Sequence, residues 1–245
     1  MAVDDHPDSP GVDDAARRAE ALALAEEACC AAERWSREYF PPDLHCRPEL
    51  VWVKGAPAGL DNVWAMGFCP LIYQHRDELA QFFYRLALLG PRRCAVEIGL
   101  EHGGLHVALR RLYEKVVTVE RSHFKVLQFV SRLPGDGRSV LVCGESQLRH
   151  TMQAVTAACA GPADLLFIDG GHRYQDVYAD YFVYRPLIRP GGVIAWHDTA
   201  GRSEDHLGIS IFLARLRAGE LDGRPHAVED IILTGTGISY EIVPG

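Results

Sequence analysis

Residues 165–199 constrain the fold more than any other part of the sequence. The stretch opens with an apolar run at 165–168 and, after a helical segment, closes with a second apolar run at 193–196. Both runs are short and uncharged, which is typical of strands buried on both faces of a parallel sheet. A strand, a helix and a second strand in this order predict one βαβ unit, with Pro190-Gly191-Gly192 as the turn that ends the helix.

Polar side chains follow each of these two runs. Asp169 and His172 come after the first run, and His197 and Asp198 come after the second. Neighbouring parallel strands end at the same edge of a sheet, and open α/β sheets bind their ligands at that edge. We therefore expect the four side chains to meet at a functional site. The alternative is that they are ordinary loop residues at two strand ends.

Strand and helix signals alternate from residue 94 to the C-terminus. This order predicts an α/β fold, a doubly wound, Rossmann-like and mostly parallel sheet whose last two strands form an antiparallel edge. The predicted strands are 94–98, 116–119, 140–143, 165–168, 193–196, 228–233 and 238–243. The predicted helices between them are 105–113, 122–133, 146–160, 175–187 and one that begins after Gly208.

The N-terminal part of the chain has a different character. Residues 13–39 are Ala-rich with helical spacing, residues 41–70 are irregular and contain Trp52 and Trp64, and residues 77–89 again have helical spacing. We expect residues 1–70 to be a helical and loop extension and residues 71–245 to be the main domain. The extension is predicted to serve as a lid or as a homo-oligomer contact, although 41–70 could equally be an ordinary surface loop.

Composition limits the partners and the compartment. The net charge is −8 and no run of Lys or Arg occurs, which argues against a nucleic-acid or anionic-membrane partner. The apolar runs are too short for a membrane span, and the acidic N-terminus does not resemble a secretory signal. The cysteines number seven and form no CxxC pair, so we expect a reduced, cytoplasmic protein. Cys94 and Cys143 are predicted to be buried in strands.

The first two predicted strands carry features of a nucleoside-binding site. Gly99 directly follows a buried strand, where it allows a tight turn and close approach of a ligand. Glu120 ends the second strand about 20 residues further on, where an acidic side chain can accept both ribose hydroxyls. The residues predicted to bind the cofactor are Glu97, Gly99, Gly103, Gly104, Glu120, Ser146 and Asp169.

The glycine loop also indicates which nucleoside binds. A dinucleotide requires a G-x-G-x-x-G loop around its pyrophosphate, and Glu101 stands where the middle glycine would be. A carboxylate at contact distance would repel a phosphate by about 1 kcal/mol even in high dielectric. Acidic residues beside the turn suit a cationic ligand with an amino-acid tail, which describes S-adenosylmethionine.

The motifs VEIGLEHGG, VTVE, CGES and FIDGGHRYQDVYADYFVYRPLIRPGGVIAWHDT resemble those of a class I S-adenosylmethionine-dependent methyltransferase. More narrowly, they are similar to the branch that contains the cephalosporin-hydroxylase-type and the macrolide and rhamnosyl sugar O-methyltransferases. The resemblance covers about residues 73–245 and implies a seven-stranded sheet. It also implies that Gln74 and His75 lie at the cofactor pocket.

In that branch a divalent metal, usually magnesium, is held by the acidic residues that end the fourth and fifth strands. The resemblance therefore implies metal ligands at Asp169, His197 and Asp198, with Asp169 and His172 as catalytic residues and His172 as the general base. His197 departs from the family, which usually has an acidic residue there. An imidazole suits manganese or another transition metal better than magnesium, or His197 points into the sheet. The other histidines, His206 among them, show no metal spacing.

These observations predict an S-adenosylmethionine-dependent O-methyltransferase, assisted by a divalent metal, that acts on a small hydroxylated metabolite such as a natural-product sugar. Two other classes remain open. A nicotinamide-dependent oxidoreductase is disfavoured by Glu101 in the glycine loop. A non-catalytic S-adenosylmethionine-binding partner protein is disfavoured by the presence of Asp169, His172 and Asp198 together.

Overall fold

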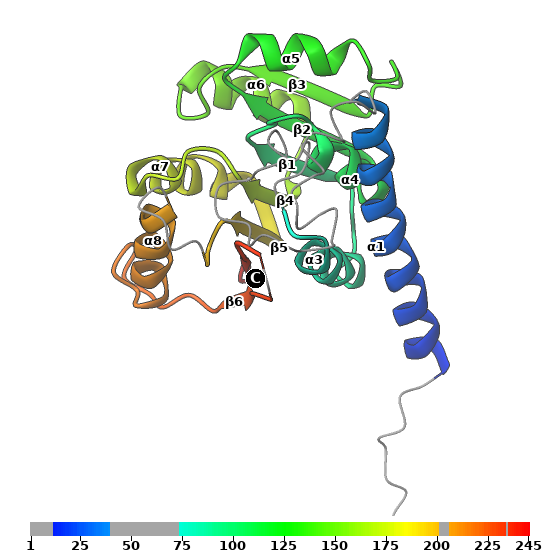
Figure 1. Cartoon of the computed structure of the whole chain (residues 1–245). Helices are drawn as coiled ribbons and strands as arrows, with labels where there is room; N and C mark the ends of the chain where they lie inside the picture. The colour runs from blue at the N-terminus through cyan, green and yellow to red at the C-terminus, as the bar shows by residue number, and fades with distance from the viewer. Residues whose placement is uncertain (1–11, 40–73, 201–205, 234) are drawn as a thin grey trace, which may run out of the picture.

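The computed structural model describes residues 12–39, 74–200, 206–233 and 235–245 (Figure 1). Its centre is a seven-stranded sheet in the order β3-β2-β1-β4-β5-β7-β6. Strands β1 to β5 pair in parallel, and β7 runs antiparallel to both β5 and β6. The predicted doubly wound sheet with an antiparallel C-terminal edge is therefore confirmed.

The strands lie close to their predicted positions. They are β1 (Cys94–Ile98), β2 (Lys115–Glu120), β3 (Ser139–Cys143), β4 (Ala163–Ile168), β5 (Ile188–His197), β6 (Val228–Ile231) and β7 (Ile238–Ile242). The helices are α1 (Val12–Tyr39), α3 (Arg76–Leu88), α4 (Gly104–Leu112), α5 (His123–Val130), α6 (Arg149–Cys159), α7 (Tyr174–Tyr184), the 3-10 turn η2 (Arg185–Leu187) and α8 (Leu207–Arg217). Every residue of β1 and β4 is buried, as the apolar runs predicted.

Helices cover both faces of this sheet (Figure 1). Helices α1, α3 and α4 share one apolar cluster with the sheet, and α6, α7 and α8 share the other. Helix α1 contributes small buried side chains, Ala25, Ala28, Cys29 and Ala32, which allow it to lie close to its neighbours. This helix is therefore part of the core, and the predicted lid at 41–70 lies outside the described residues.

Two local expectations were wrong. The Pro190-Gly191-Gly192 segment lies inside β5, because the Gly191 N–H donates to Val243 O (2.8 Å) and Gly192 O accepts from the Val243 N–H (2.8 Å). These bonds keep the segment in the sheet, where the pairing of β4 with β5 is irregular. Cys143 is exposed, since β3 is an edge strand, whereas Cys94 is buried as expected.

None of the helices in the described ranges 12–39, 74–200 and 206–233 is long and apolar enough to cross a membrane.

Candidate active site

The ends of β4 and β5 bring the predicted polar side chains together. His172 Nε2 lies 3.1 Å from Asp198 Oδ2, and His197 Nδ1 lies 3.2 Å from Asp169 Oδ1 and 3.3 Å from Asp198 Oδ1. The parallel pairing of β4 with β5 is the cause, because Ile168 and Trp196 are register partners at the strand ends. The four side chains thus form one cluster at the carboxyl-terminal rim of the sheet.

His197 is the buried centre of this cluster. Its side chain is only 1% exposed, and its Nε2 atom lies 3.0 Å from Thr236 Oγ1 on the opposite side from the two aspartates. Burial lowers the pKa of His197, but the Asp198 and Asp169 carboxylates outweigh it and hold that pKa well above its ordinary value. Burial raises the pKa of Asp198, but the His197 and His172 imidazoles outweigh it and hold that pKa well below its usual range.

His172 is the more accessible imidazole. Its side chain is 31% exposed, and the hydrogen bond to Asp198, opposed by burial, raises its pKa. Gln74 Nε2 donates to Asp169 Oδ2 at 2.5 Å, so the residue that the resemblance implied beside the pocket reaches the cluster.

One further member, His206, could not be identified from residue spacing in the sequence. Its ring stands edge-on to the His172 ring at a centroid distance of 4.8 Å, and its Nε2 lies 3.7 Å from Asp198 Oδ2. We call His172, His197, His206, Asp169 and Asp198 the rim cluster.

An open crevice of about 420 Å³ adjoins the rim cluster. Its lining comes from the ends of four neighbouring strands and includes Gly99, Glu120, Gly144, Ser146 and Asp169. This size is within the range of small-molecule and cofactor sites, which is about 300–1,000 Å³. Because Asp169 lines the crevice and also contacts His197, a ligand bound in the crevice would reach the rim cluster.

Gly99 allows two strand tips to meet beside this crevice. Its φ is +96°, and a Cβ atom there would lie 2.1 Å from the carbonyl oxygen of Asp169. Only glycine adopts this conformation without strain and leaves room for the neighbouring backbone.

Backbone donors fix the Glu120 carboxylate at the crevice. Its Oε1 accepts from the Ser122 N–H at 2.7 Å, and its Oε2 accepts from the Leu100 N–H at 3.2 Å. These bonds orient the side chain while leaving lone pairs for a ligand. On the next strand tip, Ser146 Oγ donates to Asp180 Oδ1 at 2.6 Å.

The other residues predicted to bind the cofactor lie behind the crevice lining. Glu97 is fully buried and accepts a hydrogen bond from Thr118 Oγ1 at 2.5 Å. Burial raises the pKa of Glu97 well above its usual range, so the carboxyl group favours its neutral form. Gly103 and Gly104 open α4, where a Cβ at Gly103 would collide with Phe129. Their roles in binding stay predictions.

The crevice carries mixed charge with an acidic excess. Five carboxylates and three basic side chains line it, and two ion pairs form among them, Lys125 with Glu101 at the glycine loop and Arg173 with Asp176. Glu101 has a positive φ of 46°, which is unusual for a residue with a side chain. Helix α1 supports this loop, since Trp35 Nε1 donates to His102 O at 3.2 Å.

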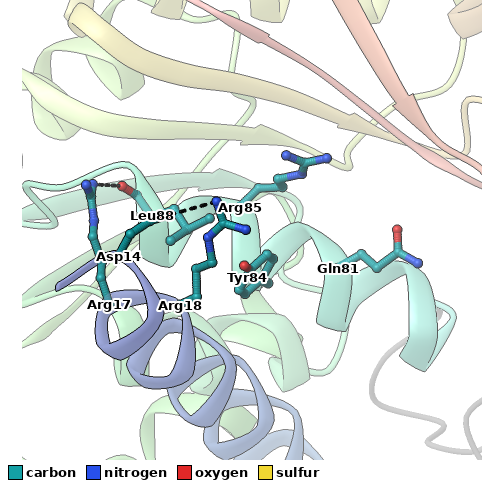
Figure 2. A pocket seen from close by; sticks show the side chains of 7 residues that line it. All are labelled: Asp14, Arg17, Arg18, Gln81, Tyr84, Arg85 and Leu88. Carbon is teal, nitrogen blue, oxygen red and sulfur yellow. Dashed lines mark hydrogen bonds and ion pairs between the residues drawn. The ribbon is translucent and has the colours of Figure 1, made fainter. Parts of the chain in front are cut away.

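A second hollow, of about 610 Å³, lies between α1 and α3 (Figure 2). Arg17, Arg18 and Arg85 line it, with Arg17 donating to Leu88 O at 2.6 Å and Arg18 paired with Asp14 at 2.8 Å. Its lining includes none of the residues of the rim cluster or of the predicted cofactor site.

The rim cluster offers donors for a divalent cation. Ligand atoms of Asp169, His197 and Asp198 lie within 4.8 Å of one another. Carboxylate oxygens suit magnesium, but the raised pKa of His197 means that its imidazole must lose a proton before it can bind an ion. This donor set fits a divalent ion that accepts a nitrogen ligand, such as manganese, better than it fits magnesium.

Residues 96–199 match the model of a family described as "Methyltransferase domain". No curated protein matches the sequence. A Staphylococcus aureus structure, named for a caffeoyl-CoA O-methyltransferase, is 15% identical over 62% of this chain and 76% of its own, with a TM-score of 0.50. This likeness supports the fold.

Two further solved structures are similar. A Bacillus cereus O-methyltransferase in complex with S-adenosylhomocysteine is 22% identical over 61% of this chain and 74% of its own (TM-score 0.49). A TDP-rhamnose 3'-O-methyltransferase of calicheamicin biosynthesis is 15% identical over 96% of each chain (TM-score 0.48).

Proposed function

Since residues 96–199 match a methyltransferase-domain family model, we propose that the protein is a class I S-adenosylmethionine-dependent O-methyltransferase that methylates a hydroxyl group of a small metabolite. We further propose that a divalent metal assists the reaction and that the acceptor is a sugar of a natural product. The methyl donor occupies the crevice beside Glu120, and the acceptor lies over His172.

One observation carries this proposal: the crevice and the rim cluster share Asp169. Asp169 lines the crevice, and its Oδ1 lies 3.2 Å from His197 Nδ1. Through Asp198, the cluster continues to His172, which is partly exposed. A donor in the crevice and a hydroxyl at His172 would therefore be neighbours, as an in-line displacement requires.

In the proposed reaction the acceptor oxygen attacks the methyl carbon of the sulfonium. The O–CH₃ bond forms while the C–S bond breaks, and S-adenosylhomocysteine leaves with the bonding electron pair on sulfur. His172 removes the hydroxyl proton as the new bond forms, and the Asp198 carboxylate stabilises the resulting imidazolium. The raised pKa of His172 makes it a stronger base than a free imidazole.

Asp169, Asp198 and a deprotonated His197 would hold the metal ion. When bound, such an ion lowers the pKa of a coordinated hydroxyl and orients vicinal oxygens of the acceptor. Gln74 holds Asp169 in place through its amide group, and Thr236 does the same for His197.

The test combines binding and turnover. Calorimetry with S-adenosylmethionine should give saturable binding, and Glu120→Gln should weaken it about 10-fold or more, because a charged hydrogen bond to the ribose contributes about 1.5–3 kcal/mol. A panel of hydroxylated acceptors is then screened for S-adenosylhomocysteine release, before and after dialysis against a chelator.

Each outcome of this test has a clear meaning. Binding of NAD without binding of S-adenosylmethionine would overturn the proposal in favour of an oxidoreductase. Cofactor binding without product from any acceptor would favour a non-catalytic partner protein. Full activity after chelation would remove the metal from the proposal and leave methyl transfer standing.

A further inference from the structure

A second group of metal-binding side chains lies on the solvent side of Asp198. It consists of His172, Asp198 and His206, whose ligand atoms lie within 4.8 Å of one another. Two of the distances are shorter, with His172 Nε2 at 3.1 Å and His206 Nε2 at 3.7 Å from Asp198 Oδ2. The donors in a tetrahedral zinc site are about 3.4 Å apart, so small side-chain rotations would place all three around one ion.

The chemistry of these donors favours particular metals. Two imidazole nitrogens and one carboxylate oxygen suit zinc, cobalt and related transition ions, whereas magnesium prefers oxygen ligands. The site is also open, because the side chains of His172 and His206 are 31% and 22% exposed. An ion there would keep a position for water, as zinc ions with three protein ligands do.

The inner group, Asp169, His197 and Asp198, is less accessible to such an ion. The His197 side chain is 1% exposed, and both of its ring nitrogens lie at hydrogen-bond distance from protein atoms, Asp169 Oδ1 at 3.2 Å and Thr236 Oγ1 at 3.0 Å. Asp169 Oδ2 already accepts from Gln74 at 2.5 Å. An ion arriving from solvent therefore meets His172 and His206 first.

Binding an ion would change what His172 can do. A neutral imidazole has one in-plane lone pair, and when that pair binds a metal the other ring nitrogen carries the proton. His172 would then have no lone pair with which to accept a proton from an acceptor hydroxyl.

We propose that His172, Asp198 and His206 form a second metal site, which takes zinc-like transition ions in preference to magnesium and which, when occupied, inhibits methyl transfer. The inhibitory part rests on the proposed function, whereas the binding part does not.

Cobalt is the probe for binding, because its visible absorption reports nitrogen ligation. The full-length protein is titrated with Co²⁺ in excess Mg²⁺ and in the absence of S-adenosylmethionine. We expect saturation at one ion per chain, and a loss in affinity of about 10-fold or more in His206→Ala, since loss even of an outer-shell partner of a metal ligand costs 10–100-fold. The control His150→Ala, which removes an exposed histidine on α6, should bind within about twofold of the parent.

A further variant separates the two groups of donors. Asp169→Asn should keep Co²⁺ affinity within about threefold of the parent, because Asp169 is not a ligand of the proposed site. An equal or larger loss in Asp169→Asn than in His206→Ala would overturn the assignment in favour of the inner group. No saturable binding, or displacement of Co²⁺ by Mg²⁺, would also overturn it.

The inhibitory part has its own readout. Zn²⁺ should inhibit methyl transfer, and the half-inhibitory concentration, normalised to each variant's own activity without zinc, should rise about 10-fold or more in His206→Ala. Co²⁺ binding with unchanged zinc inhibition would overturn the inhibitory role. If no methyl transfer occurs with any acceptor, the proposed function fails while the cobalt titration still decides whether the site exists.

Discussion

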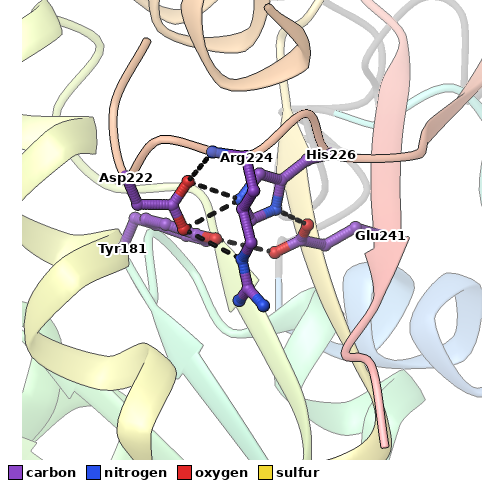
Figure 3. A network of polar contacts seen from close by, with 5 residues as sticks. All are labelled: Tyr181, Asp222, Arg224, His226 and Glu241. Carbon is purple, nitrogen blue, oxygen red and sulfur yellow. Dashed lines mark hydrogen bonds and ion pairs between the residues drawn. The ribbon is translucent and has the colours of Figure 1, made fainter. Parts of the chain in front are cut away.

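Two histidine–carboxylate clusters in the described part of the chain are built from similar side chains but differ in geometry. In the rim cluster, three imidazoles converge on two aspartates, and His172 and His206 are partly exposed. In the second cluster, which we call the rear cluster, His226 lies between two carboxylates (Figure 3). The rear cluster consists of Tyr181, Asp222, Arg224, His226 and Glu241.

The partners of His226 lie on opposite sides of its ring. Nδ1 is 2.6 Å from Glu241 Oε2, and Nε2 is 3.0 Å from Asp222 Oδ2. Tyr181 donates to the remaining Glu241 oxygen at 2.9 Å, and the side chains of His226 and Glu241 are each 3% exposed. Both nitrogens of the rear ring thus bond to the protein itself in a buried position, whereas two of the rim imidazoles, His172 and His206, lie on side chains that are 31% and 22% exposed. The comparison suggests catalysis for the first cluster and stability for the second.

The strongest loss of activity should follow from removing His172 from the rim cluster. His172→Ala should lower the rate of methyl transfer at saturating cofactor about 10²–10⁴-fold, which is the usual contribution of a general base. Affinity for S-adenosylmethionine and the melting temperature should change little, because His172 does not line the crevice and is 31% exposed. Single-turnover kinetics would measure the loss. A rate within a fewfold of the parent would exclude His172 as the base.

The corresponding change in the rear cluster should affect folding instead. His226→Ala leaves the buried Glu241 carboxylate without its imidazole partner, and breaking a buried pair costs about 3–5 kcal/mol. Urea unfolding would measure this cost, while turnover per folded molecule should remain near that of the parent. A strong loss of turnover with unchanged stability would show that the rear cluster has a functional role and would remove the contrast.

Most members of the rim cluster could be predicted from the sequence. Asp169, His172, His197 and Asp198 could be expected to meet, because strand ends in a βαβ unit follow from short apolar runs. His206 could not be predicted in the same way. It contacts Asp198 from the start of α8, and no spacing between the two residues in the sequence predicts that contact.

Two other outcomes depended on sheet geometry. Glu97 lies between Val96 and Ile98 on β1, and successive side chains of a strand point to opposite faces of the sheet. Val96 and Ile98 therefore face one layer of helices, and Glu97 faces the other, where α4 carries the buried His106. The alternation of side chains along the strand could have predicted that Glu97 points away from Val96 and Ile98. The exposure of Cys143 could not be read from its apolar run, because only the strand order shows that β3 has a free edge.

A smaller effect on stability is expected for Asp180, which lies on α7 next to Tyr181 of the rear cluster. Burial raises the pKa of Asp180 from 3.8 to about 6, although the Ser146 hydrogen bond opposes this shift. The folded state therefore binds the proton more tightly than the unfolded state. Asp180 favours folding below about pH 4, and this contribution is lost as the pH rises to about 6.

Asp180→Asn should remove that pH-dependence. The amide oxygen can still accept from Ser146, and the variant should be more stable than the parent by about 1–3 kcal/mol at pH 8, with a smaller gain at pH 5. Urea unfolding at both pH values measures the difference. An equal gain at both would show that Asp180 does not titrate in this range.

The smallest loss of stability is expected for a change at Tyr181 in the rear cluster. Tyr181→Phe removes the hydroxyl that donates to Glu241 Oε1 at 2.9 Å but keeps the buried ring that packs against Trp196. Leaving one carboxylate oxygen with fewer donors should cost about 1–2 kcal/mol, less than His226→Ala, because His226 still pairs with Oε2. In the double variant with His226→Ala the two costs should not add, since both side chains stabilise the same carboxylate. Additive costs would mean that Tyr181 and His226 act independently and that the rear cluster is not one network.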